Sequence, residues 1–171
     1  ISDKSNNQFS ILNQISKKRK LRLLDIKKKI NQIKNNSNLF PGYFQKKNLT
    51  MAILAAQLCG LQNNKIKKSL IKLKTIEGRL ELIKKYPNNI KIFIDYAHTP
   101  DALSEVIKSI KSTYNKNITL VFGCGGERDY KKRPIMARIA KLHCKKIYVT
   151  DDNPRKENPA KIRKEITKNL K

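Results

Sequence analysis

Residues 90–170 alternate short β-branched runs with longer amphipathic runs, and this alternation constrains the fold more than any other feature of the sequence. The strand-like runs are IKIFIDYA, ITLVFG and KIYVTD, at residues 90–97, 118–123 and 146–151. Helical patterns follow them at residues 99–114, 133–144 and 158–170. Strands that alternate with helices in this way form parallel sheets. The order therefore predicts an α/β fold with helices on both faces of a parallel sheet.

Turn and capping residues mark the ends of these elements. GRLELI, at residues 78–83, predicts one more strand, which the turn YPNN joins to the next run. Thr99 and Pro100 have the residue types of an N-cap and a first helical position. Pro134 opens the following helix. The apolar face expected for that helix holds Ile135, Ile139 and Leu142.

The beginning of the chain has a different character. Residues 1–38 are polar and rich in Lys. Within them, the alternating runs KLRLLDI (residues 20–26) and KKINQI (residues 28–33) predict edge strands of a sheet. LFPGYF, at residues 39–44, predicts a turn.

Two helices are expected next. The first is a well-buried helix over residues 48–60 that stops at Gly60, and the second covers residues 63–76. The expected apolar side of the second helix holds Ile66, Leu70, Ile71 and Leu73. The pattern changes near Thr75–Gly78, which predicts two domains at residues 1–76 and 77–171.

Charge and cysteines limit the possible partners. The net charge is +26, with 39 Lys and Arg against 13 Asp and Glu, which is compatible with nucleic-acid binding. However, Lys dominates along the whole chain and aromatic residues make up only 6%, so nucleic acid is not expected as the main partner. The three cysteines have no paired spacing, which favours a reducing, cytoplasmic setting. No membrane span or signal peptide is visible.

Three polar clusters follow the predicted strands: DYAHTPD, GCGGERD and TDDNPR. Ligands of open parallel sheets bind at the carboxyl ends of the strands, so the clusters predict a shared polar rim. Simpler roles exist for single residues, since Thr99 is a cap, His98 suits a loop, and Arg128 can pair with Asp129. The glycines lack the spacing of a dinucleotide or phosphate-binding loop.

The segments GRLE, DYAHTPDAL, FGCGGERD, KRPIM and VTDDNPR occur in the order and spacing of the Mur ligases, and the chain resembles this family from about Leu39 to its end. The resemblance implies that residues 1–76 are the end of a central ATP-binding domain. It implies that residues 77–171 are an incomplete Rossmann-like C-terminal domain.

The resemblance also implies a reaction and its partners. The nearest members of the family use ATP and Mg²⁺ to activate a UDP-N-acetylmuramoyl dipeptide as an acyl phosphate, which the amino group of meso-diaminopimelate attacks. By position, the diaminopimelate-binding residues are Arg128, Asp152, Asn153, Pro154 and Arg155. The ATP-binding residues are Arg79, Asp95, His98 and Thr99.

The sequence departs from the family at several points. Lys131 stands where the family has Gly, and no GxxGKT/S phosphate loop or carbamylated lysine is found. The resemblance therefore places no catalytic residue and no metal ligand in this chain, and we expect no catalysis by residues 1–171 alone. The alternatives are a related Mur or folylpolyglutamate-type ligase for another amino acid, or a basic nucleic-acid-binding module.

Overall fold

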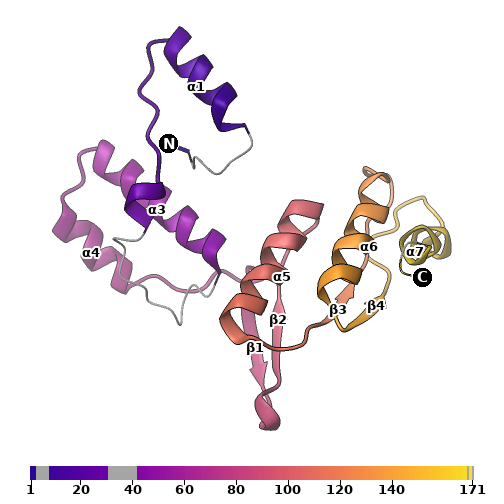
Figure 1. Ribbon diagram of the computed structural model, residues 1–171. Coiled ribbons are helices and arrows are strands. Elements are labelled where there is room, and N and C mark those ends of the chain that lie inside the picture. The colour runs from indigo at the N-terminus through magenta and orange to yellow at the C-terminus, as the bar shows by residue number, and fades with distance from the viewer. Residues whose placement is uncertain (3–7, 31–41, 169, 171) are drawn as a thin grey trace. The chain divides into compact units, whose positions relative to one another are not determined.

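The computed structural model describes residues 1–2, 8–30, 42–168 and 170 (Figure 1). The chain forms two compact units, Ile1–Ile76 and Glu77–Lys171. Among the described residues, no helix has both the length and the apolar character needed to cross a bilayer. The assignment of the first unit to the end of a central ATP-binding domain stays a prediction.

The first unit is helical in its described part. Its helices are α1 (Phe9–Lys18), α2 (Lys27–Ile30), α3 (Tyr43–Leu58) and α4 (Asn63–Ile71). The strand predicted over residues 20–26 is wrong, because the described residues there form only an isolated bridge between Ser2 and Asp25. The Asp25 carboxylate accepts the Lys27 N–H at 3.0 Å, and this local bond starts α2 in place of the second strand. Residues 31–33 lie outside the described residues.

Helices α3 and α4 match the prediction in type but not in burial. Helix α3 stops just before Gly60, whose φ of +83° suits glycine at a helix end. Its only buried residues are Thr50 and Leu54, so the well-buried helix is a wrong prediction. In α4, Ile66 is buried but Ile71 is 78% exposed, because five residues along a helix rotate a side chain about 140° away. The turn predicted at residues 39–44 lies partly outside the described residues, and its last two residues begin α3.

The second unit has the predicted order of strands and helices, which confirms the α/β class. Its elements are β1 (Glu81–Lys85), the 3-10 turn η1 (Pro87–Asn89), β2 (Lys91–Ile94), α5 (Pro100–Tyr114), β3 (Thr119–Phe122), α6 (Lys132–His143), β4 (Lys146–Val149) and α7 (Pro159–Thr167). Thr99 caps α5 as predicted, since its Oγ1 accepts the Ala102 N–H at 3.3 Å. Asn158 caps α7 in the same way.

The strands form two separate pairs in the described part of the chain. Strands β3 and β4 are parallel, with Thr119 opposite Lys146 at the first position of the register. Strand β2 pairs antiparallel with β1. The tight turn between them, with Asn88 and Asn89 at positive φ, folds β2 back onto β1. The expected continuous parallel sheet is therefore not observed, and only β3–β4 keeps that arrangement.

Helices α5, α6 and α7 share one core with the β3–β4 pair. The core includes Leu103, Ile107, Phe122, Met136, Ala137, Ala140, Ile162 and Ile166. The other face of the pair is open, because Val121 is 63% and Tyr148 56% exposed. Helices on both faces were predicted, so this expectation is wrong for the described residues.

Helix α6 buries a different face from the predicted one. Its buried residues are Arg133, Met136, Ala137 and Ala140, at the i, i+3, i+4, i+7 spacing of a helix face. Of the three residues predicted to face inward, Leu142 is 75% exposed and Ile135 is also exposed, whereas Ile139 is partly buried against the core. The buried alanines leave room for the close contacts that α6 makes with α5 and α7. Packing against α5 and α7, rather than the apolar pattern of the helix alone, therefore determines which face of α6 turns inward.

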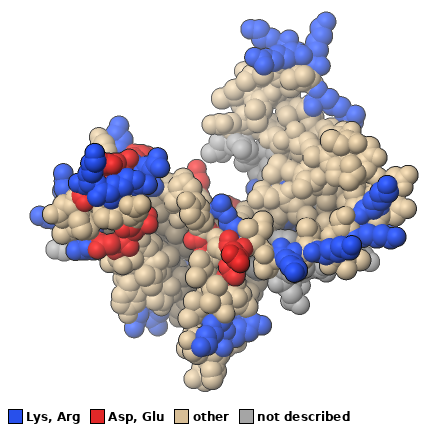
Figure 2. Space-filling view, turned by 180° about the vertical axis from the view of Figure 1, so that it is seen from behind, with Lys and Arg blue, Asp and Glu red and all other residues tan. Residues whose placement is uncertain are grey.

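Charged side chains are distributed unevenly. On the face shown in Figure 2, Lys and Arg lie in several groups with uncharged surface between them. Of the 13 acidic residues, all but Asp3 and Asp25 lie in the second unit. The few carboxylates of this basic chain are therefore concentrated in the unit that carries the predicted site.

Met136→Ala tests the observed face of α6. Met136 is 1% exposed, so its truncation leaves a cavity and is expected to lower the free energy of unfolding by about 2–4 kcal/mol. Leu142→Ala, on the same helix, is the matched control and should cost under about 0.5 kcal/mol. Urea unfolding of both variants measures the difference. Equal costs would show that the helix is rotated from the orientation described.

Candidate functional site

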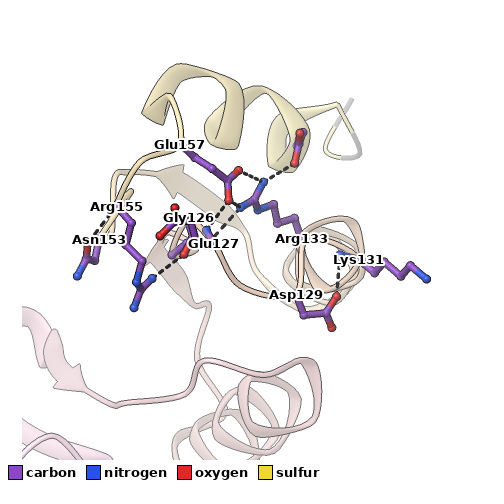
Figure 3. Close-up of polar contacts among 10 residues, drawn as sticks. Gly126, Glu127, Asp129, Lys131, Arg133, Asn153, Arg155 and Glu157 are labelled. Carbon is purple, nitrogen blue, oxygen red and sulfur yellow. Dashed lines mark hydrogen bonds and ion pairs between the residues drawn. The ribbon is translucent and has the colours of Figure 1, made fainter.

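The loops after β3 and β4, residues 123–129 and 150–157, pack against each other at the carboxyl end of the parallel pair and form a rim (Figure 3). The Gly126 N–H donates to the Asn153 carbonyl at 2.9 Å and joins the two loops directly. Parallel strands end side by side, so residues far apart in the sequence meet here. The rim has the position at which open α/β sheets bind ligands.

Glycines make this close approach possible. A Cβ on Gly126 would lie 1.9 Å from the Pro154 carbonyl oxygen, and one on Gly123 would lie 2.5 Å from that of Thr150. Both distances are far inside van der Waals contact. Any side chain at these positions would force the loops apart. This role was missed from the sequence, because the spacing of phosphate-binding glycines carries no information on how two loops pack.

Arg155 crosses from one loop of the rim to the other. Its guanidinium Nη1 donates to the Gly126 carbonyl at 2.6 Å, and its backbone N–H donates to Asn153 Oδ1 at 3.2 Å. The backbone of Arg155 is left-handed, with φ at +49°, and Glu127 in the facing loop has φ at +50°. Such strained non-glycine residues concentrate at functional sites. Arg155 remains exposed, so its guanidinium is accessible to a ligand.

Arg133 lies beneath the rim with its side chain only 1% exposed. Its Nη1 and Nη2 donate to both oxygens of Glu157, at 3.0 and 2.9 Å. Nη1 also donates to Glu165 at 2.6 Å, and Nη2 to the Gly125 carbonyl at 3.3 Å. The Glu157 carboxylate also accepts the backbone N–H of Glu127. One buried cation therefore holds both loops and helix α7.

The network shifts the pKa of both ionic partners toward the charged forms. The hydrogen bond with Glu157 raises the pKa of Arg133, against the opposing effect of burial. The bond from Arg133, followed by that from the Glu127 backbone, lowers the pKa of Glu157 below its ordinary value of 4.5. Arg133 and Glu157 are therefore both charged at neutral pH.

The other predicted diaminopimelate residues also lie on the rim. Asp152 and Arg128 are exposed, and Pro154 is half-buried. Asn153 Oδ1 accepts the Arg155 N–H, so this amide oxygen orients the loop as well as facing solvent. Among the described contacts, the alternative pairing of Arg128 with Asp129 is not found. The Asp129 carboxylate accepts the Lys131 N–H at 2.9 Å instead.

The predicted ATP residues gather at the exit of β2. Asp95 Oδ2 accepts the Leu80 N–H at 2.7 Å and holds the segment before β1. Burial raises the pKa of Asp95, while backbone hydrogen bonds from Leu80 and Ala97 and the charge of Arg79 oppose this. The Arg79 guanidinium lies 5.0 Å from the centroid of the Tyr96 ring. The Arg79 guanidinium and the Asp95 carboxylate therefore lie near each other at the end of β2.

His98 and Thr99 continue this cluster toward the rim. The His98 ring packs edge-on against Tyr96 at 5.3 Å, and its Nδ1 lies 3.1 Å from the Tyr96 carbonyl. Lys132, at the start of α6, donates from Nζ to the His98 carbonyl at 2.7 Å. Thr99 is engaged as the cap of α5. The exposed Tyr96 ring was not predicted as a site residue, although it stands inside the motif DYAHTPD.

The predicted residues thus fall into two clusters in one unit, and not on the single rim that was expected for all three polar segments. Three further residues were missed from the sequence, Gly126, Arg133 and Glu157, although KRP and the glutamate two positions after DNPR were visible. The described residues contain no group of three or more His, Cys, Asp or Glu side chains that could hold a metal ion.

The family comparison agrees with this arrangement. The family Mur ligase, glutamate ligase domain, matches residues 78–171, which is more than half of the chain. The chain belongs to the Mur ligase family, and the second unit carries its C-terminal domain. The resemblance to this family inferred from the motifs is confirmed.

Individual relatives show which ligases of the family this chain is similar to. The chain is 42% identical over 127 residues to the UDP-N-acetylmuramoyl-L-alanyl-D-glutamate–2,6-diaminopimelate ligase of Rickettsia montanensis, covering 73% of this chain and 26% of that protein. A solved structure of a ligase with this name is 35% identical, with a TM-score of 0.52 over 76% of this chain and 26% of the other.

A folylpolyglutamate synthase from Thermotoga maritima is 25% identical, with a TM-score of 0.55 over 74% of this chain and 30% of the other. The chain spans about a quarter of the length of the curated relatives it matches.

The network around Arg133 predicts a pH dependence of stability. The pKa of Glu157 is lower in the folded than in the unfolded chain, so its contribution is present above pH 4.5 and is lost as the pH falls through the folded value. Asp95 acts in the opposite sense, because its pKa is raised. In Glu157→Gln the free energy of unfolding should therefore fall less steeply below pH 4.5 than in the parent.

Urea unfolding between pH 3 and pH 7 measures this dependence. Glu105→Gln, on helix α5 away from the rim, is the control and should follow the parent. If Glu157→Gln keeps the slope of the parent, the ion pair with Arg133 does not contribute to stability.

Proposed function

We propose that this chain is part of an ATP-dependent ligase that adds meso-diaminopimelate to UDP-N-acetylmuramoyl-L-alanyl-D-glutamate, in the cytoplasmic synthesis of peptidoglycan precursors. The observation that carries the proposal is the contact between DNPR and GGER, in which Arg155 and Asn153 bind the backbone of Gly126. The names of the relatives at 42% and 35% identity support it.

The chemistry of the rim suits this amino acid. Diaminopimelate carries two carboxylates and two ammonium groups. It therefore needs guanidinium donors at one place and carboxylate acceptors at another. Arg128 and Arg155 are the exposed cations of GERD and DNPR, and Asp152 is the exposed acceptor. Because Gly126 fixes one nitrogen of Arg155, the planar group is oriented before the ligand arrives.

Asp95 and Arg79 form the proposed ATP side of the site, with His98 and Thr99 beside them. A carboxylate accepts hydrogen bonds from ribose hydroxyls, and a guanidinium donates to phosphate oxygens. ATP supplies the phosphoryl group that activates the acceptor carboxylate. The sequence contains no GxxGKT/S phosphate loop, so the proposal gives this chain recognition of the amino acid and part of the ATP site rather than catalysis.

A related ligase that adds another amino acid is the second candidate. The structural similarity to the folylpolyglutamate synthase supports it secondarily. The two candidates differ in what the amino acid presents, because diaminopimelate carries both a second carboxylate, which lysine lacks, and a second ammonium group, which glutamate lacks. Preference for diaminopimelate over both lysine and glutamate therefore distinguishes them.

Arg155→Ala tests the proposed role of DNPR. The assay uses a chimera in which this chain replaces the matching segment of the Rickettsia montanensis ligase. A hydrogen bond to a charged group is worth about 1.5–3 kcal/mol, so the loss of kcat/KM for diaminopimelate should be about ten- to a hundredfold. Use of lysine should fall far less. Arg155→Lys should rescue partly, since a point charge cannot replace a planar fork.

Lys156→Ala is the matched control for this experiment, because it removes one exposed positive charge from the next residue of the same loop. It should leave the preference for diaminopimelate unchanged. The proposed role of Arg155 is wrong if both amino acids lose activity by the same factor. An unmodified chimera that ligates neither amino acid counts against the proposed function itself.

Asp95→Asn tests the ATP side in the same chimera. Asparagine keeps an oxygen for the Leu80 N–H but removes the charge. The KM for ATP should rise on the order of tenfold, as expected for one lost charge-assisted hydrogen bond, with little change in the KM for diaminopimelate. Asp101→Ala, in the exposed first turn of α5, is the control. Equal increases for both substrates would contradict the assignment.

A further inference from the structure

Arg133 differs from the other arginines of the second unit because its guanidinium is buried and its partners belong to three separate segments. Gly125 is in the loop after β3, Glu157 ends the loop after β4, and Glu165 is on α7. Figure 3 shows the Arg133 side chain extending from α6 toward the rim and α7. From helix α6, Arg133 therefore connects the loop after β3, the loop after β4 and helix α7.

Burial of the Arg133 guanidinium costs free energy unless hydrogen bonds and ion pairs replace its contacts with water. A buried charge loses its hydration, and an apolar side chain of similar volume is often equally or more stabilising at such a position. Arg133 also buries its Nε without a hydrogen-bond partner among the described residues. Stability alone is therefore a weak reason for an arginine here, whereas fixing two loops requires its several donors.

Arg133 binds one residue on each loop close to Arg155 or to its contacts. It binds the Gly125 carbonyl, and the adjacent Gly126 holds both Asn153 and Arg155. On the other loop it binds Glu157, whose backbone N–H donates to the Pro154 carbonyl at 3.0 Å. Movement of Arg133 would therefore displace both sides of the rim.

We infer that Arg133 is a positioning residue for amino-acid recognition. It fixes the distance between the loops of Arg128 and Arg155 and thereby sets the preference for a ligand with a distal carboxylate. This inference rests on the proposed function, because it concerns the same site. The competing role is a staple between α6 and α7, for which the contact with Glu165 is sufficient.

The test compares variants of the 171-residue chain in binding to meso-diaminopimelate and to L-lysine, by NMR titration. Arg133→Met should weaken diaminopimelate binding about tenfold, the equivalent of one lost charge-assisted hydrogen bond, and leave lysine binding within about twofold. Arg133→Lys should restore part of the difference. Glu165→Gln replaces the ion pair to α7 by a neutral hydrogen bond and should keep the selectivity. Arg138→Met, on the exposed side of α6, is the matched control.

The ratio of the two affinities separates positioning from stability, because partial unfolding weakens both ligands equally. Equal weakening in Arg133→Met, or parental selectivity in both Arg133 variants, overturns the inference. If Arg133→Met does not fold, Arg133→Lys and Glu157→Gln decide on the same criterion.

The proposed function and the inference fail in different ways. An unmodified chain that binds neither amino acid contradicts the proposed function. Amide hydrogen exchange of Gly126 then decides the positioning role, since faster exchange is expected in Arg133→Lys and Arg133→Met. Exchange equal to that of the unmodified chain overturns that role.

Discussion

The peptide unit at Gly126 is the constraint on which the rest of the site depends. Its N–H donates to the Asn153 carbonyl and its carbonyl accepts from Arg155, so two hydrogen bonds join this peptide unit to the facing loop. The approach is possible only because position 126 has no Cβ, which would lie 1.9 Å from the Pro154 oxygen. Parallel pairing of β3 and β4 brings the loops together, and Gly126 then orients Arg155, the arginine proposed to bind the ligand.

Several of the few carboxylates in this chain hold the backbone or the buried arginine of the site in place. In a chain of net charge +26, an isolated carboxylate has many cations nearby, but few such surface pairs contribute much. Glu157 and Glu165 instead neutralise one buried arginine, and Asp95 accepts backbone N–H groups at the other cluster. These carboxylates hold loops in place, while Asp152, proposed to bind the amino acid, is exposed. Different carboxylates therefore hold the structure and carry the proposed recognition.

Much of the second unit could be predicted from the sequence, because Thr99 and Asn158 are explicit caps and the strands are short and β-branched. The order of the motifs was also enough to predict one rim for Arg128, Asp152 and Arg155. The buried face of α6 could not be predicted from hydrophobicity, since Ala137, Ala140 and an arginine turn inward while Leu142 faces solvent. The YPNN turn indicated the link between β1 and β2, whereas the role of Arg133 depends on contacts between distant residues that no local pattern records.

The most direct test of the central claim is a crystal structure of the chain with meso-diaminopimelate bound. The claim is that the two loops form one site that recognises an amino acid through its distal carboxylate. We predict that this carboxylate lies within hydrogen-bond distance of the Arg155 guanidinium, with the bond between Gly126 and Asn153 intact. A ligand bound away from the rim, or one whose distal carboxylate contacts neither Arg155 nor Arg128, would contradict the account.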